Sequence, residues 1–238
     1  MGAADYRLVH HVKNGRSVYS FCMCPGGTVV AATSEEGRVV TNGMSQYSRN
    51  ERNANAGIVV GITPQDYRQD GAAGSGPVNP LDGVAFQRFW ESRAFELGGG
   101  TYEAPGQLVG DFIKGQASSA FGNVLPSYQP GVRPTDLAAR GNASLPDCAI
   151  DAIREALPAF ERQIKGFNRP DAVLTGVETR TSAPLRITRG RDFQSLNVRG
   201  LYPAGEGAGY AGGIMSAGVD GVEVAEALAR ALLGIEVS

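Results

Sequence analysis

The 238-residue sequence has few charged side chains and no cluster of one sign. Asp, Glu, Lys and Arg together make up 19% of the residues, the formal net charge is -2, and no run of Lys or Arg is longer than two. Proteins that bind nucleic acid concentrate positive charge on one surface, because contacts with phosphates dominate the affinity. The composition therefore excludes nucleic acid as an expected partner.

Long apolar runs and a cysteine framework are missing as well. No apolar run approaches the roughly 18 residues of a membrane-spanning helix, and residues 1–12 contain two His and one Asp where a secretion signal would be apolar. Three cysteines are an odd number, which fits a reducing compartment better than a set of disulfides. We expect a cytoplasmic protein with no membrane partner.

Histidine is rare too, and its positions exclude two kinds of site. The chain has only His10 and His11, and adjacent residues of a strand point to opposite faces, so the pair is poorly placed to chelate one metal ion. We predict no metal site. With no further His and no G-x-S-x-G turn, the sequence also argues against a Ser-His or Cys-His hydrolase.

Short β-branched and aromatic runs, separated by Gly, Asn and Pro, indicate strands over residues 6–63. The turn-forming residues Cys24-Pro25-Gly26-Gly27 predict a hairpin that joins strands at 17–23 and 28–32. Residues 56–63 are apolar on both faces, which predicts a central strand. We therefore expect the first part of the chain to be mostly β.

The remainder predicts helices and a return to strands. Helical periodicity covers 82–97 and ends at three consecutive glycines, and Ser144 with Asp147 resembles a capping box before a further helix. Further elements are expected at 107–115 (helix), 172–174, 185–188 and 201–204 (strands), and 213–233 (helix). Together these elements predict an α+β fold.

A glycine-rich loop lies between the last predicted strand and helix. Gly207-Ala208-Gly209-Tyr210-Ala211-Gly212 satisfies G-x-G-x-x-G, the pattern of a dinucleotide-binding βαβ unit. Such a unit needs a helix, a second strand and an acidic residue about 20 residues on, whereas the predicted helix takes most of the 26 residues that follow Gly212. We interpret the loop as closing a fold.

Two interpretations of that loop remain open. Its backbone N–H groups, at the positive end of a helix, suit a phosphate or an electron-rich heterocycle. Alternatively, the glycines merely permit a tight turn and close packing. Glu206 favours binding, because a carboxylate inside the turn can accept hydrogen bonds from a sugar or ribityl hydroxyl.

Four separated stretches carry a resemblance to a known family. They are 20–27 (SFCMCPGG), 39–45 (VVTNGMS), 176–184 (GVETRTSAP) and 201–207 (LYPAGEG), the last continued by Ala211-Gly212-Gly213-Ile214. All four resemble signature segments of a bacterial family of FAD-dependent dehydrogenases, a branch of the two-dinucleotide-binding-domain flavoproteins, and they occur in the family's order. The resemblance spans nearly the whole chain.

The resemblance implies a domain organisation and a cofactor. Family members begin with a strand, a G-x-G-x-x-G turn and a helix that hold the ADP half of FAD, and no such unit precedes Tyr6. The chain thus resembles a C-terminal portion: residues 5–190 an inserted, β-rich substrate domain with helices, and residues 191–238 the closing strand and helix of an FAD-binding domain whose N-terminal βαβ is missing. The residues implied to bind FAD are Gly205, Glu206, Gly207, Gly212, Gly213, Ile214, Thr179 and Arg180.

The resemblance leaves the catalytic residues open, with Cys22, Cys24 and Arg180 as candidates. Cys22 and Cys24 could form a redox dithiol beside a flavin, although in a regular strand their Cα atoms would lie about 6.6 Å apart, at the upper end of the range for a disulfide. They could equally be small buried residues on one sheet face. Arg180 could supply positive charge to an anionic substrate or a reduced flavin, or belong to a solvated loop.

Two polar clusters could line a substrate cleft or be ordinary solvated loops. The first contains Arg49, Arg52, Asn53 and Asn55, and the second is residues 178–180. We expect a small-molecule substrate, which the full-length enzyme would oxidise by transferring a hydride to its flavin.

The implied partner is the N-terminal FAD-binding half of the same protein. The isolated chain is therefore expected to bind FAD weakly or not at all and to be inactive, and its terminal helix could associate with a second copy. The alternative function is a non-enzymatic module that binds a small ligand or a protein.

Overall fold

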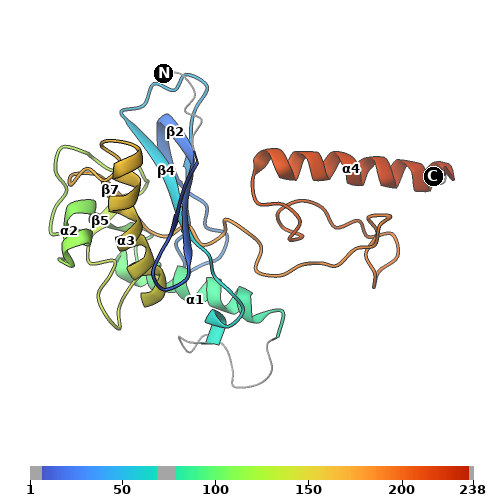
Figure 1. Ribbon diagram of the computed structural model, residues 1–238, viewed down its shortest axis with the longest axis horizontal. Helices are drawn as coiled ribbons and strands as arrows, with labels where there is room; N and C mark the ends of the chain where they lie inside the picture. Colours follow the sequence, from blue (N-terminus) through green and yellow to red (C-terminus); the bar gives the residue numbers. More distant parts are fainter. Residues whose placement is uncertain (1–6, 69–78, 236–238) are drawn as a thin grey trace.

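The computed structural model describes residues 7–68 and 79–235, shown in Figure 1. The first two residues of the predicted substrate domain, 5 and 6, lie outside the described residues. Two β-sheets and several helices form a main body, and an irregular segment leads from it to a long C-terminal helix. The predicted mixture of helices and strands is confirmed.

The first sheet is built around one long strand, β2, which pairs antiparallel with each of its neighbours. Its strands are β1 (Leu8–His11), β2 (Ser17–Ala31), β3 (Thr41–Met44) and β4 (Asn53–Val60). β4 pairs with β2 along most of its length, whereas β1 and β3 each pair with one end of it. The expectation that residues 6–63 are mostly β is borne out over the residues that the structure describes.

The predicted hairpin at Cys24-Pro25-Gly26-Gly27 is wrong, because β2 continues through this segment. Its pairing with β4 shifts register between Phe21 and Cys24 and again between Cys24 and Gly27. Gly26 has a positive φ of 53°, and a Cβ there would lie 2.0 Å from the carbonyl oxygen of Arg49. The turn-forming residues are accommodated as β-bulges, which add residues without reversing the chain.

The prediction that residues 56–63 form a central strand is also wrong. Among the described residues, β4 pairs only with β2 and is therefore an edge strand. Its apolar side chains have another reason: Ile58 and Val60 pack against the main core, and Val59 lines a cavity.

The second sheet is small and places a strand edge close to β4. β5 (Ala104–Leu108) pairs parallel with β6 (Val132–Pro134) and antiparallel with β7 (Val173–Thr175). The strand predicted at 172–174 is confirmed as β7. The helix predicted at 107–115 is confirmed only as the shorter α2 (Val109–Lys114), since residues 107 and 108 belong to β5.

Two longer helices cover these sheets. α1 (Asp82–Leu97) has the predicted bounds and ends at Gly98-Gly99-Gly100, where the Gly99 N–H donates to the Glu96 carbonyl at 2.9 Å. α3 (Asp147–Gln163) follows Pro146 without a side-chain cap, so the predicted capping box is wrong: the Ser144 hydroxyl donates to the Leu137 carbonyl instead. A short 3-10 turn, η1 (Asp66–Arg68), precedes α1. None of the described helices is long and apolar enough to cross a membrane.

The main core lies between the first sheet, α2 and α3. α3 packs its apolar face against β1, β2 and β4, which places it over one face of the sheet. The buried side chains of this cluster are Leu8, Val12, Val18, Val109, Phe112, Ala143, Ile150, Ala152, Ile153, Ala156, Leu157 and Phe160. The domain therefore has a core of its own, independent of the C-terminal helix.

The C-terminal segment differs from the prediction in its strands but not in its helix. α4 (Ile214–Leu233) matches the predicted helix and lies apart from the main body, above the irregular chain that leads to it (Figure 1). The predicted strands at 185–188 and 201–204 are not strands, and one isolated bridge joins Arg189 and Ser195. A strand needs a neighbour to form a ladder, and no described strand lies beside either segment.

Candidate functional site

An ion pair holds the C-terminal arm, which we define as residues 185–235. The guanidinium of Arg189 contacts both carboxylate oxygens of Asp220 on α4 and donates to the carbonyl of Pro203 at 2.7 Å. The Gly205 N–H donates to the same carboxylate at 2.7 Å, and Arg189 also lies over the ring of Tyr210. The Arg189 hydrogen bond holds the pKa of Asp220 below its usual range. These contacts fix the glycine-rich loop against α4.

A line of small and apolar residues along α4 is largely exposed. The buried residues of α4 are Asp220 and Val224, which face the loop. This apolar face comprises Ile214, Ala217, Gly221, Ala225, Leu228 and Leu232. On that face Ile214 is 90% exposed and Leu232 is 78% exposed. The described chain therefore leaves this surface uncovered.

The glycine-rich loop presents backbone donors and an uncommitted carboxylate. Within the described residues, the N–H groups of Gly212, Gly213 and Ile214 have no acceptor. Gly207 has open space around it, and the half-exposed carboxylate of Glu206 accepts no hydrogen bond from a described residue. Gly205, with a φ of 69°, forms the turn at the start of the loop. The loop thus has no side chains at the two glycines that directly precede α4.

The segment before the arm is tied to α1 through a buried carboxylate. Glu91 has no exposed surface, and its carboxylate accepts two hydrogen bonds from the guanidinium of Arg180 and one from the hydroxyl of Thr179, all at 2.8 Å. Arg180 also donates to Ser34. Two of the predicted FAD-binding side chains, Thr179 and Arg180, are therefore engaged inside the protein, and their bonds fix the chain directly after Glu178.

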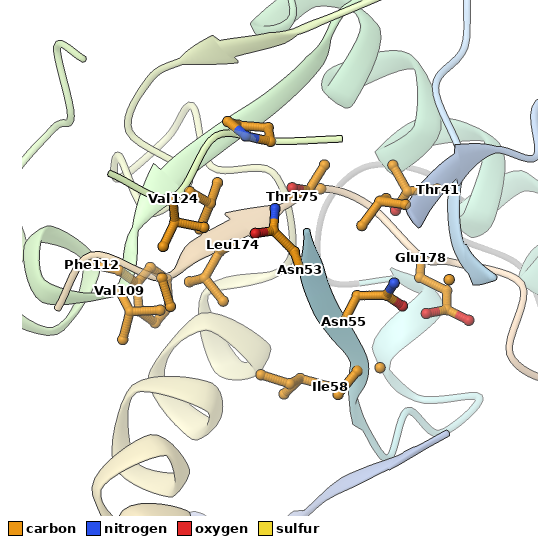
Figure 2. Close-up of a pocket in the computed structure, with 18 of the residues that line it drawn as sticks. Thr41, Asn53, Asn55, Ile58, Val109, Phe112, Val124, Leu174, Thr175 and Glu178 are labelled. Atoms are coloured by element: carbon orange, nitrogen blue, oxygen red, sulfur yellow. The ribbon is translucent and has the colours of Figure 1, made fainter. Parts of the chain in front are cut away.

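A cavity of about 550 Å³ lies between β4 and β7, the facing edges of the two sheets. Consecutive residues of both edges line it, at 52–58 and 172–178. Figure 2 shows that one end is apolar, with Val109, Phe112 and Leu174, and that the other end carries Asn55 and Glu178. A cavity of this size and mixed lining is typical of a small-molecule site.

Glu178 connects this cavity with the C-terminal arm. It also lines a second cavity, of about 470 Å³, whose wall includes Gly212 of the arm. Burial raises the pKa of Glu178, and the nearby carboxylate of Glu206 raises it further. Thus an acidic side chain of the glycine-rich loop lies close enough to an acidic side chain of the main body to raise its pKa.

Cys22 and Cys24 are separate thiols on the bulged part of β2. Cys22 is exposed and has a φ of 56°, whereas Cys24 is half-buried and donates to the Cys22 carbonyl at 3.4 Å. Burial raises the pKa of Cys24, and the charges of Cys22 and Glu178 add to this effect. A raised pKa lowers the thiolate fraction, which is the reactive form. A redox role for this pair remains a hypothesis.

The structure brings members of both polar clusters to the first cavity. Arg52, Asn53 and Asn55 of the first cluster line it together with Glu178 of the second, whereas Arg49 does not. Asn53 is already engaged, since its amide donates to the carbonyl of Leu125 at 2.8 Å. Each cluster thus contributes residues to the lining of a cavity, and their role in binding a substrate stays a prediction.

Changing Glu178 to Gln should alter how stability depends on pH. Because the folded protein keeps the Glu178 proton to a higher pH than the unfolded chain, the free energy of unfolding falls as pH rises from the ordinary Glu pKa, about 4.3, through the raised value. Glu178→Gln removes this fall, so the variant should be more stable than the parent near about pH 8 and no more stable near about pH 4. Urea unfolding at both pH values measures the difference. Glu96→Gln, at an exposed position of α1, is the control, and an advantage equal at both pH values would contradict the prediction.

Comparison with known proteins shows the family to which this chain belongs. The family described as "FAD-dependent protein, C-terminal domain-like" matches residues 1–181, which include both sheets, α1 to α3 and Glu178. The chain belongs to this family. The match ends at the segment that Glu91 anchors, just before the C-terminal arm begins.

A relative shows that the chain corresponds to part of a longer protein. An uncharacterized protein of Clostridium beijerinckii is 54% identical over 225 residues. The aligned region covers 94% of this chain but only 40% of the relative. The chain therefore spans about 40% of the length of the curated relative that it matches.

Several residues that organise the site were not found from the sequence. They are Glu91, Arg189 and Asp220. Glu91 is 88 and 89 residues from its partners, and Arg189 and Asp220 are 31 residues apart, so no local motif marks them. Two of them carried a usable signal: Glu91 lies beside Trp90 and three residues before Ala94 on the buried side of α1, and Asp220 lies four residues before Val224 on α4. A carboxylate on the buried face of a helix indicates a cationic partner.

Proposed function

We propose that this chain is the substrate-binding part, and one side of the flavin site, of an FAD-dependent oxidoreductase. Membership of the FAD-dependent protein C-terminal family carries the proposal. The site supports it, because the substrate-sized cavity and the glycine-rich loop come together at Glu178. The activity, a dehydrogenase reaction, belongs to the full-length protein, and the chain alone is inactive.

More specifically, we assign this chain to the C-terminal portion of a two-dinucleotide-binding-domain flavoprotein. Residues 5–190 are the inserted substrate domain and residues 191–238 the closing part of the FAD domain, although contacts within the arm already begin with Arg186 and Arg189. The N-terminal FAD-binding half covers the exposed apolar face of α4. Its strands would also give residues 201–204 the neighbour that a strand requires.

We place the protein in the cytoplasm, consistent with the free thiols of Cys22, Cys24 and Cys148.

The glycine-rich loop fits part of FAD. The free N–H groups of Gly212, Gly213 and Ile214, at the positive end of a 20-residue helix, suit a pyrophosphate oxygen. Gly205 and Gly207 leave room for close approach, and the carboxylate of Glu206 can accept a hydrogen bond from a ribityl hydroxyl. In this proposal the N-terminal half binds the adenosine end of FAD, so the chain alone binds FAD weakly.

The remaining residues supply orientation and a proton site. Bound FAD supplies a hydride acceptor. Thr179 and Arg180 act as positioning residues, because their bonds to Glu91 hold the backbone around Glu178. Glu178 can hold or release a proton at its carboxyl group, and burial and the charge of Glu206 both raise its pKa.

The test compares the longer relative with this chain. We expect the full-length Clostridium beijerinckii protein to purify with flavin absorbance, and this chain to leave the fluorescence of added FAD unquenched. A full-length relative that neither carries nor takes up FAD would overturn the flavoprotein assignment and favour a non-enzymatic ligand-binding module. Tight, quenched FAD binding by this chain would show that it holds the whole dinucleotide site.

A further inference from the structure

The cavity between β4 and β7 has chemically different ends. Its apolar end reaches the main core, where Val109 and Phe112 are buried and Leu174 packs against them. Its polar end lies beside Glu178 (Figure 2). Glu178 also lines the second cavity together with Gly212 of the C-terminal arm. A ligand that fills the cavity therefore needs an apolar body and a polar group at one end.

Two polar groups at that end lack partners within the described residues. The amide nitrogen of Asn55 is buried and has no hydrogen-bond acceptor. The carboxylate of Glu178 receives no hydrogen bond from residues 7–68 or 79–235. Buried polar groups are nearly always paired, and leaving one unpaired is costly. One group is thus a donor without an acceptor, and the other is free to accept.

Two glycines bring these groups to neighbouring positions. A Cβ on Gly57 would lie 3.4 Å from a carboxylate oxygen of Glu178, and a Cβ on Gly43 would lie 2.1 Å from the side-chain oxygen of Asn55. Asn55 and Gly57 are two residues apart on β4, so they share one face of the strand. The carboxylate above Gly57 therefore lies next to the amide of Asn55, as Figure 2 shows.

We propose that this cavity binds a compound with an apolar aromatic or aliphatic body and one hydroxyl group, which accepts a hydrogen bond from Asn55 and donates one to Glu178. A hydroxyl oxygen provides both functions at a single atom. An ionised carboxylate could not donate and would lie beside Glu178, whereas a methyl group would leave both side chains unpaired. As a statement about the substrate of the enzyme, the proposal rests on the function proposed above.

Isothermal titration of this chain with three probes of one shape tests the head group. The probes are 2-naphthol, 2-naphthoate and 2-methylnaphthalene, at neutral pH and without flavin. We expect 2-naphthol to bind more tightly than either analogue, by about 5–10-fold for each net hydrogen bond that the analogue loses. Equal affinity for 2-methylnaphthalene, tighter binding of 2-naphthoate, or no binding of 2-naphthol would each overturn the proposal. Because no flavin is present, these results are independent of the flavoprotein test.

Variants then locate the binding site. Asn55→Leu should weaken 2-naphthol about 5–10-fold and leave 2-methylnaphthalene unchanged, while Leu174→Trp, which fills the apolar end, should weaken both probes. Asn197→Leu, at an exposed position of the arm, should weaken neither. Naphthol binding that survives both cavity variants would place the ligand elsewhere and overturn the assignment. Circular dichroism confirms that each variant is folded.

Discussion

Replacing Asp220 with Ala is expected to release the glycine-rich loop from α4, with a loss of about 3–5 kcal/mol in the local stability of the arm. The substitution leaves the nearly buried guanidinium of Arg189 without its carboxylate and the Gly205 N–H without its acceptor. Hydrogen exchange of the arm measures the loss, and trypsin should cleave faster after Arg186, Arg189 and Arg199.

Two further variants distinguish the ion pair from a general effect on the helix. Glu226→Ala, at an exposed position of α4, should leave exchange and cleavage unchanged. The double variant Arg189→Met with Asp220→Leu should recover much of the lost stability, because apolar replacement of a buried pair is often neutral or stabilising. Unchanged protection of residues 185–213 in Asp220→Ala would show that the pair does not hold the loop.

Replacing Glu91 with Ala is the second change with a large expected effect. It removes a fully buried carboxylate that receives three hydrogen bonds from Thr179 and Arg180, and leaves their donors unpaired. We expect a loss of about 3–5 kcal/mol in the free energy of unfolding, together with a change in the environment of Glu178. Urea denaturation measures the loss.

The matched control lies on the same helix. Glu96 pairs with Arg93 at the surface and is 61% exposed, so Glu96→Ala should cost about 1 kcal/mol or less. The stability loss of Glu91→Gln should lie between those of Glu91→Ala and Glu96→Ala, because Gln keeps hydrogen bonding but removes the charge. Equal losses for Glu91→Ala and Glu96→Ala would contradict the view that Glu91 anchors this segment.

The parts of the fold that were predicted correctly have local causes. Three glycines end α1, a long stretch of small and apolar residues forms α4, and β-branched residues form β7. The bulges of β2 depend instead on whether a partner strand continues past Cys24, and β4 does. The same residues would have formed a turn beside a shorter partner, so the sequence alone could not decide between the two.

The candidate site was predictable in its segments but not in its contacts. The clusters at 52–55 and 178–180 were recognised as polar, and the structure places members of both on one cavity. The sequence could not show that Arg180 is occupied by Glu91, 89 residues earlier. It also could not show that the carboxylate of Glu178 receives no hydrogen bond. This depends on which donors from distant parts of the chain lie near the carboxylate in the fold.

The ion pair of the arm has a consequence for how the protein assembles. Arg189 and Asp220 are only 31 residues apart, and the other contacts that shape the glycine-rich loop also arise within residues 185–220. Contacts between residues close in sequence form quickly. The loop can therefore take its shape before it meets the two sheets, and reach its final neighbours as a preformed unit.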